Sequence, residues 1–127
     1  MIVKEIEATT IERRIINMKT SYFSKSANNP RAVSIAGKAP SWFKGREYKQ
    51  LAPNYWFFKK YKEDGDQDFY TKSFQKEILD NLDPHEVAKE LGEEAILLCW
   101  ERTGKFCHRH IVSKWFKENE IEIEELE

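Results

Sequence analysis

Residues 93–116 read EEAILLCWERTGKFCHRHIVSKWF, and this stretch decides the fold that the rest of the chain must accommodate. Ala95 to Cys99 is a short and wholly apolar run, which is typical of a strand buried on both faces of a sheet. Glu101 to Lys105 is polar and contains a glycine, so it predicts a turn. From Cys107 onward the apolar residues recur at helical spacing, which predicts an amphipathic helix.

Reactive side chains gather where this strand ends and this helix begins. Cys99 closes the strand, and Cys107, His108 and Arg109 open the helix. Ligands of open α/β sheets bind at the carboxyl ends of the strands, and a helix N-terminus attracts anions through its unpaired N–H groups. Arginine adds a bidentate donor for phosphate or carboxylate. We therefore predict an anion or phosphate site at the carboxyl end of the central strand, with Arg109 as its main binding residue.

Other candidate ligand-binding residues are basic, hydroxyl or aromatic side chains in loops or at strand ends: Lys105, Arg102, Ser21, Tyr22, Trp42 and Tyr48. When no ligand is bound, we expect Arg109 to pair with Glu101 or another carboxylate, because a guanidinium in a crevice seeks a planar acceptor.

A cysteine-dependent enzyme is the alternative. A cysteine at a helix start has a lowered pKa and is more nucleophilic, and a neighbouring histidine can act as its base. The candidate catalytic residues are Cys107, His108, Cys99 and Glu101. Cys99, inside the apolar run, fits a small buried core residue equally well.

The spacing C-x7-C-H-x-H matches none of the usual zinc-finger spacings, so we expect no metal site, and nothing in the sequence indicates a cofactor. The N-terminus lacks the apolar segment of a secretory signal, so the two cysteines are expected to be free thiols. No apolar run approaches the length of a membrane span. We expect a cytoplasmic protein that does not engage a membrane.

Aromatic and basic residues alternate between Trp42 and Lys62, a pattern that can track a phosphate backbone and stack bases. The same rings equally fit a helix packed onto the sheet, with its lysines in solvent. Neither a P-loop nor a dinucleotide glycine fingerprint occurs, which argues against both of those nucleotide-binding classes.

Two β-prone runs, Lys19–Phe23 and Ala32–Ala36, precede the central strand. We expect all three strands to be parallel neighbours in one sheet. Helices are expected from about Asp68 to Leu82 and from Asp83 to Gly92, where an aspartate cap is followed by proline. The predicted fold class is α/β, a single compact domain with a mostly parallel Rossmann-like sheet flanked by helices.

The predicted domain spans residues 1–127, with its core at about 18–116, an N-terminal extension at 1–17 and an acidic tail at 117–127. The tail holds six glutamates and one lysine, a net charge of −5, so the rest carries +4 of the chain's total of −1. Its alternation of glutamate with isoleucine predicts either an edge strand or a disordered segment.

The run Leu97–Glu101 followed by Phe106–His110 resembles the signature of the domain-of-unknown-function 488 family, in which an apolar strand ends in cysteine and a Cys-His-Arg triplet opens the last helix. Similar segments occur in the same order at Thr20–Phe23, Pro40–Phe43, Glu47–Lys49, Leu51–Pro53 and Leu82–Pro84. The resemblance covers about residues 18–116 and implies a compact Rossmann-like domain without a settled activity.

Three functions remain open on these residues. The first is binding or processing of a phosphorylated small molecule, nucleotide or nucleic acid at the predicted anion site. The second is thiol-based phosphoryl or sulfur transfer. Rhodaneses and cysteine phosphatases share the strand-end cysteine, but their loop is Cys-x5-Arg, whereas Lys105 stands six residues after Cys99. The third is a non-catalytic interaction module whose acidic tail and aromatic face meet a protein partner. Family analogy alone is a weak argument for any of the three.

Overall fold

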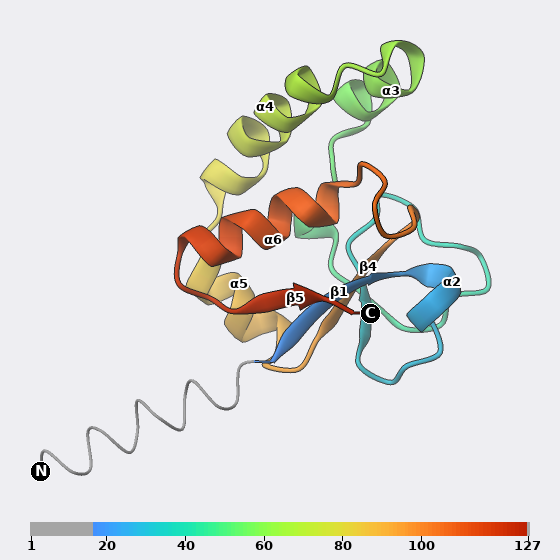
Figure 1. Cartoon of the computed structure of the whole chain (residues 1–127), viewed down its shortest axis with the longest axis vertical. Helices are drawn as coiled ribbons and strands as arrows, with labels where there is room; N and C mark the ends of the chain where they lie inside the picture. The colour runs from blue at the N-terminus through green and yellow to red at the C-terminus, as the bar shows by residue number, and fades with distance from the viewer. Residues whose placement is uncertain (1–16, 127) are drawn as a thin grey trace, which may run out of the picture.

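The computed structural model describes residues 17–126, which form one sheet with its main helical layer on one face (Figure 1). The extension proposed at residues 1–17 lies outside this range except for Asn17. Five strands pair in the order β3-β2-β4-β1-β5, and every pairing is parallel. The strands are β1 (Met18–Tyr22), β2 (Ala32–Ser34), β3 (Arg46–Glu47), β4 (Ile96–Cys99) and β5 (Ile123–Glu125).

Strand β4 is the middle strand, and all four of its residues are buried. It pairs with β1 on one side and with β2 on the other, so the predicted parallel neighbours are confirmed. Its side chains alternate between two apolar clusters, as the period of two in a strand requires. Leu97 belongs to the larger cluster, whereas Ile96 and Leu98 belong to the smaller one. The apolar run is therefore the element on which both faces are built.

Helices from the second half of the chain cover the larger cluster. The helices are α2 (Phe23–Ser26), α3 (Tyr55–Asp64), α4 (Gln67–Glu77), α5 (Pro84–Leu91) and α6 (His108–Glu118), with 3₁₀ turns η1 (Lys49–Leu51) and η2 (Leu79–Asn81). Helix α6 packs on β4, β1 and β5, and α4 packs against α6 (Figure 1). The opposite face is covered by Phe23 of α2 and by the loop that contains Phe43.

Local signals account for where these helices begin and end. The Asp83 carboxylate accepts from the backbone N–H groups of His85 and Glu86, and Pro84 takes the first helical position, as predicted. The helix expected over residues 68–82 is shorter than predicted. Helix α4 ends at Glu77 because the backbone turns at Ile78 (φ −107°, ψ −67°) into the 3₁₀ turn η2.

The acidic tail forms an edge strand, which decides between the two alternatives left open by its sequence. Strand β5 pairs in parallel with β1, and Ile121 and Ile123 are buried in the larger cluster. Glu122 between them and Glu124 after them are exposed, because side chains alternate along a strand. The tail is thus part of the domain.

The aromatic middle of the chain divides between core and surface. Phe57 is fully buried and packs edge-on against Tyr70, with ring centroids 5.2 Å apart. Tyr55, Trp56 and Trp42 are more than half exposed. Core packing therefore accounts for part of this segment only. Within residues 17–126, no helix is long and apolar enough to cross a membrane.

Replacing Leu97 by alanine tests the central position of β4. The side chain is fully buried, so we expect the free energy of unfolding to fall by about 2–5 kcal/mol. Urea denaturation measures the change. Tyr55→Ala, at a position that is 72 % exposed, is the control and should change the free energy by only about 0.5 kcal/mol. Equal losses in both variants would contradict the burial of β4.

Candidate functional site

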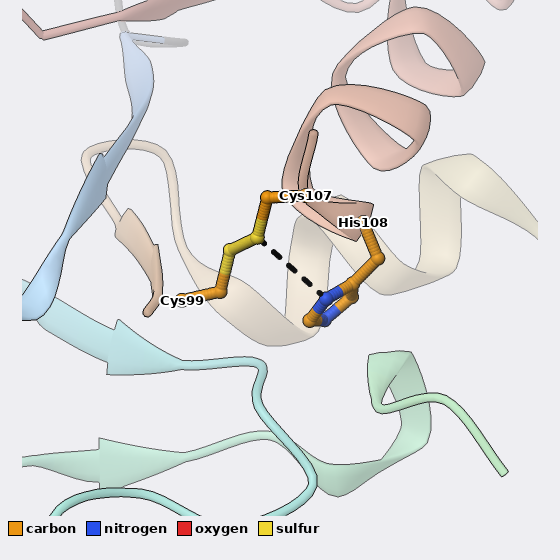
Figure 2. A group of neighbouring side chains, drawn as sticks. All are labelled: Cys99, Cys107 and His108. Atoms are coloured by element: carbon orange, nitrogen blue, oxygen red, sulfur yellow. Dashed lines mark hydrogen bonds between the residues drawn. A yellow bond between two sulfur atoms is a disulfide. The ribbon is translucent and has the colours of Figure 1, made fainter. Parts of the chain in front are cut away.

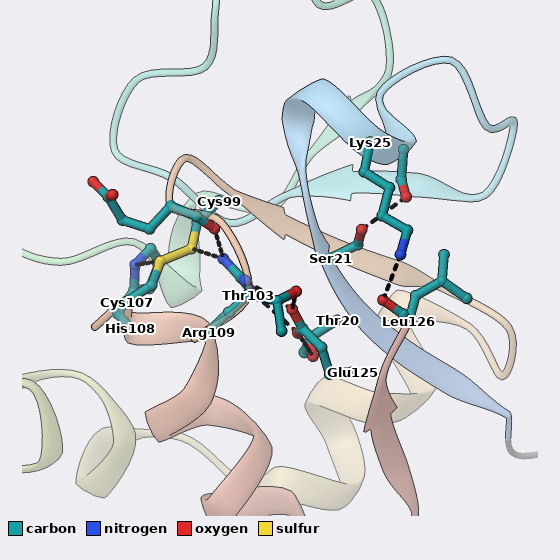
Figure 3. A network of polar contacts seen from close by, with 12 residues as sticks. Thr20, Ser21, Lys25, Cys99, Thr103, Cys107, His108, Arg109, Glu125 and Leu126 are labelled. Atoms are coloured by element: carbon teal, nitrogen blue, oxygen red, sulfur yellow. Dashed lines mark hydrogen bonds and ion pairs between the residues drawn. A yellow bond between two sulfur atoms is a disulfide. The ribbon is translucent and has the colours of Figure 1, made fainter. Parts of the chain in front are cut away.

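Some of the predicted site residues meet at the carboxyl ends of β1 and β4, where α6 begins: Ser21, Cys99, Cys107, His108 and Arg109 (Figure 3). Tyr22 and Cys99, the last residues of these strands, are paired in register. Cys107 is the N-cap of α6, and His108 and Arg109 are its first two residues. The site therefore combines two strand ends with one helix start, which is the usual ligand-binding position of open α/β sheets.

Arg109 is the most enclosed charged side chain of the site, with an exposed fraction of 0 %. Its Nε donates to Oε1 of Glu125 at 3.1 Å and its Nη2 donates to Oε2 at 2.8 Å, a bidentate ion pair. Its Nη1 donates to the Cys99 sulfur at 3.3 Å and to the Glu101 backbone carbonyl. The predicted carboxylate partner is confirmed, but Glu125 supplies it, and Glu101 contributes its main chain.

The Glu125 carboxylate is held by more donors than the ion pair alone. Thr20 Oγ1 donates to Oε1 at 2.5 Å, and Thr103 Oγ1 donates to Oε2 at 2.7 Å. Partial burial by itself raises the pKa of the Glu125 carboxyl, but the hydrogen bonds from Arg109, Thr20 and Thr103 outweigh it and lower that pKa to about 2. Four donors on three side chains thus converge on one anionic group.

The two cysteines are joined, and the expectation of free thiols is wrong. A disulfide links Cys99 at the end of β4 to Cys107 at the start of α6, with Cα atoms 7.2 Å apart (Figure 2). The expectation rested on an inference about the cellular compartment, which says nothing of how close the fold brings the two sulfurs. The loop of residues 100–106 returns the chain from the strand end to the helix start, and this brings the two sulfurs together.

His108 lies beside this sulfur pair and is buried. Its Nε2 is 2.7 Å from the Ile35 backbone carbonyl, which can only accept, so Nε2 carries the proton and Nδ1 is left with a free lone pair. Nδ1 lies 4.0 Å from the Cys107 sulfur (Figure 2). Burial lowers the pKa of His108 to about 4, so the ring is neutral at physiological pH. The sulfurs of Cys99 and Cys107 and one His108 nitrogen lie within 4.8 Å of one another, an arrangement able to hold a metal ion.

The remaining predicted site residues are distributed more widely. Ser21 is buried at the strand end, with its hydroxyl 2.7 Å from that of Ser26. Arg102, Lys105 and the side chain of Glu101 are exposed on the loop between β4 and α6. The Tyr48 hydroxyl donates to the Glu90 carboxylate, and Trp42 is exposed on the loop before β3. Burial and the hydrogen bond to Glu90 raise the pKa of the Tyr48 hydroxyl above its ordinary value.

Sequence reasoning missed Glu125, Thr20 and Thr103 as members of the site. Glu125 lay in a segment interpreted as a solvated acidic tail, although the alternating isoleucines did indicate an edge strand. Thr20 lies one residue before Ser21 within β1 and points to the opposite face from it. Thr103 sits in the loop, where the sequence shows only a turn.

The Glu125 pair predicts a defined loss of stability in acid. Because the pKa in the folded state is lowered from 4.5 to about 2, the pair stabilises the fold fully above pH 4.5 and loses its effect as pH falls toward 2. We expect the wild type to be more stable than Glu125→Gln near neutral pH, with a gap that narrows through this window. Urea denaturation at several pH values measures the gap. Glu122→Gln, on the exposed side of the same segment, should resemble the wild type throughout.

Comparison with known proteins adds the family. No curated protein and no solved structure matches this chain. A family model described as the active DUF488-N3 subclade, DUF488-N3a, matches residues 17–120, which span β1 to the end of α6 and include Cys99, Cys107, His108 and Arg109. This range agrees with the resemblance drawn from the cysteine and Cys-His-Arg motifs. The chain belongs to the DUF488 family.

Proposed function

We propose that this chain binds or processes a phosphorylated ligand, such as a nucleotide or a nucleic acid, at the position that the Glu125 carboxylate holds. The observation that carries the proposal is the convergence of Arg109, Thr20 and Thr103 on that single carboxylate. A phosphate group requires the same partners, namely a bidentate guanidinium and neighbouring hydroxyl donors. The donors that hold the Glu125 carboxylate are therefore placed to hold two oxygens of a phosphate group.

The placement of Glu125 supports an exchange of this kind. It belongs to a three-residue strand at the edge of the sheet, and β5 pairs with β1 alone. At the end of this segment, the backbone carbonyl of Leu126 accepts an exposed hydrogen bond from Lys25 of α2. Because an edge strand has a neighbour on one side only, its displacement costs less than the opening of a central strand. The phosphate of a ligand would then pair with Arg109 in place of the Glu125 carboxylate.

Charge and position both favour an anionic ligand. The chain apart from its tail carries a net charge of +4, and Arg102 and Lys105 are exposed on the loop that borders the site. Strand ends that meet a helix start are the common position of such sites in α/β proteins.

A cysteine-dependent reaction is the second candidate. It is favoured by the contact of Arg109 Nη1 with the Cys99 sulfur, because a guanidinium stabilises a thiolate. Reduction of the disulfide would be required first. In the reduced protein we expect an alkylating reagent to label Cys107 faster than Cys99, since Cys107 is 7 % exposed at a helix start and Cys99 is 1 % exposed. Peptide mass spectrometry measures the two rates, and equal slow labelling would remove this candidate.

Phosphate binding by charge variants tests the first candidate. Isothermal titration calorimetry with inorganic phosphate and with adenosine monophosphate should show tighter binding by Glu125→Gln than by the wild type, by roughly 10-fold or more, because the competing carboxylate is gone. Arg109→Ala should weaken binding by about 1.5–3 kcal/mol, the range for a charged hydrogen bond. Arg109→Lys keeps the charge but loses the bidentate geometry, so its affinity should lie between those of the wild type and Arg109→Ala.

Arg31→Ala is the matched control, since this exposed arginine pairs with Glu94 at 3.5 Å and stands outside the site. It should bind both probes like the wild type. Circular dichroism establishes that each variant is folded. A folded Glu125→Gln protein that binds neither probe would contradict the proposal, whereas equal affinity for both probes would restrict recognition to the phosphate group.

A further inference from the structure

We propose that Cys99, Cys107 and His108 form a site for a thiophilic divalent metal ion, with zinc as the first candidate, when the two cysteines are reduced. The three ligand atoms lie within 4.8 Å of one another, and all three residues are buried. Two thiolates and one imidazole are a donor set that zinc accepts in proteins. The spacing along the chain did not indicate this site, because the folded loop and not a short motif brings the ligands together.

The orientation of His108 is that of a metal ligand. Metal-binding histidines almost always donate their second ring N–H to a carbonyl, a carboxylate or water, which fixes the tautomer. Here Nε2 donates to the Ile35 carbonyl at 2.7 Å, and the free lone pair of Nδ1 lies on the side of the Cys107 sulfur. The ring needs no reorientation to present Nδ1 to an ion between the sulfurs.

The backbone spacing of the two cysteines favours ligands around an ion. Their Cα atoms are 7.2 Å apart, whereas disulfide-bonded cysteines usually lie about 4.4–6.8 Å apart. With zinc–sulfur bonds of about 2.3 Å and tetrahedral geometry, the two sulfurs would stand roughly 3.8 Å apart. Cysteine Cα atoms 7.2 Å apart therefore match two sulfurs held apart by an ion better than two sulfurs bonded to each other.

Charge balance also favours this site. Two thiolates neutralise a divalent cation, and His108 is neutral, so the filled centre carries no net charge in a buried position. The neighbouring Arg109 and Glu125 neutralise each other. Arg109 Nη1 donates to the Cys99 sulfur, and such a hydrogen bond supports a metal-bound thiolate.

Three protein ligands leave one tetrahedral position for water or for a ligand atom, which is the pattern of catalytic zinc sites. Within residues 17–126, the cluster has no fourth cysteine, histidine or carboxylate. Metal binding would make the sulfurs ligands in place of nucleophiles, so this inference is separate from the cysteine-dependent candidate. It does not require the phosphate proposal either.

Metal analysis of the full chain under reducing conditions tests the inference. The protein is reduced with a phosphine, loaded with zinc and dialysed to remove unbound metal. Inductively coupled plasma mass spectrometry should then find one equivalent of zinc per chain. Replacement of zinc by cobalt should give sulfur-to-cobalt charge-transfer absorption and intense visible bands typical of a tetrahedral ion. Cys107→Ser and His108→Gln should each weaken zinc binding by about 100-fold or more, since even loss of an outer partner costs 10–100-fold.

His85→Gln is the matched control, because His85 is an exposed histidine in the first turn of α5. It should bind zinc and cobalt like the wild type. Zinc uptake by the wild type in phosphate-free buffer needs no bound anion, so a protein that binds zinc but neither phosphate probe would separate this inference from the proposed function. Folded, reduced wild-type protein without bound zinc or a cobalt charge-transfer band would overturn the inference, and so would full zinc binding by Cys107→Ser.

Discussion

The structure at the carboxyl end of the sheet is organised by the buried guanidinium of Arg109, which must be hydrogen-bonded. A charge without exposure to water is tolerated only when it is paired and hydrogen-bonded. Arg109 meets this requirement with atoms from three separate parts of the chain: the Glu125 carboxylate of β5, the Cys99 sulfur of β4 and the Glu101 carbonyl of the following loop. One side chain of α6 therefore connects the central strand, the edge strand and the loop between β4 and α6.

Through this connection the acidic tail becomes part of the fold. The six glutamates of residues 117–127 repel one another, and an edge strand of three residues has little intrinsic stability. Burial of Ile121 and Ile123 supplies an apolar anchor, and the ion pair to Arg109 adds a specific one. The pair also fixes the register of β5 against β1, because Thr20 binds the same carboxylate that Arg109 holds. Charge and apolar pattern act together at this edge.

Features encoded by local pattern were predictable from the sequence. The apolar run of β4, the helical spacing after Cys107 and the Asp83 cap each depend on neighbouring residues, and each prediction is confirmed. The partner of Arg109 was predictable as a carboxylate but not as Glu125, because sixteen residues and a reversal of the chain separate the two. The contact between Cys99 and Cys107 likewise depends on the path of the intervening loop, for which residue types alone give no distance.

The composition of this site is difficult to explain by stability alone. Replacing a buried ion pair by apolar residues of similar volume is often neutral or stabilising, so a fold of this kind has no general need for Arg109 and Glu125. The same holds for His108, whose neutral ring occupies a buried position beside Phe74, where a leucine would require no hydrogen bond. Two adjacent groups whose places apolar residues could take, and which together present sulfur, imidazole, guanidinium and carboxylate at the strand ends, are better explained by ligand chemistry. Arg109 donates to both the Cys99 sulfur and the Glu125 carboxylate. A metal ion on the sulfurs therefore changes the charge next to the anion site, and an anion on Arg109 changes the charge next to the sulfurs. Each ligand would then alter the affinity for the other.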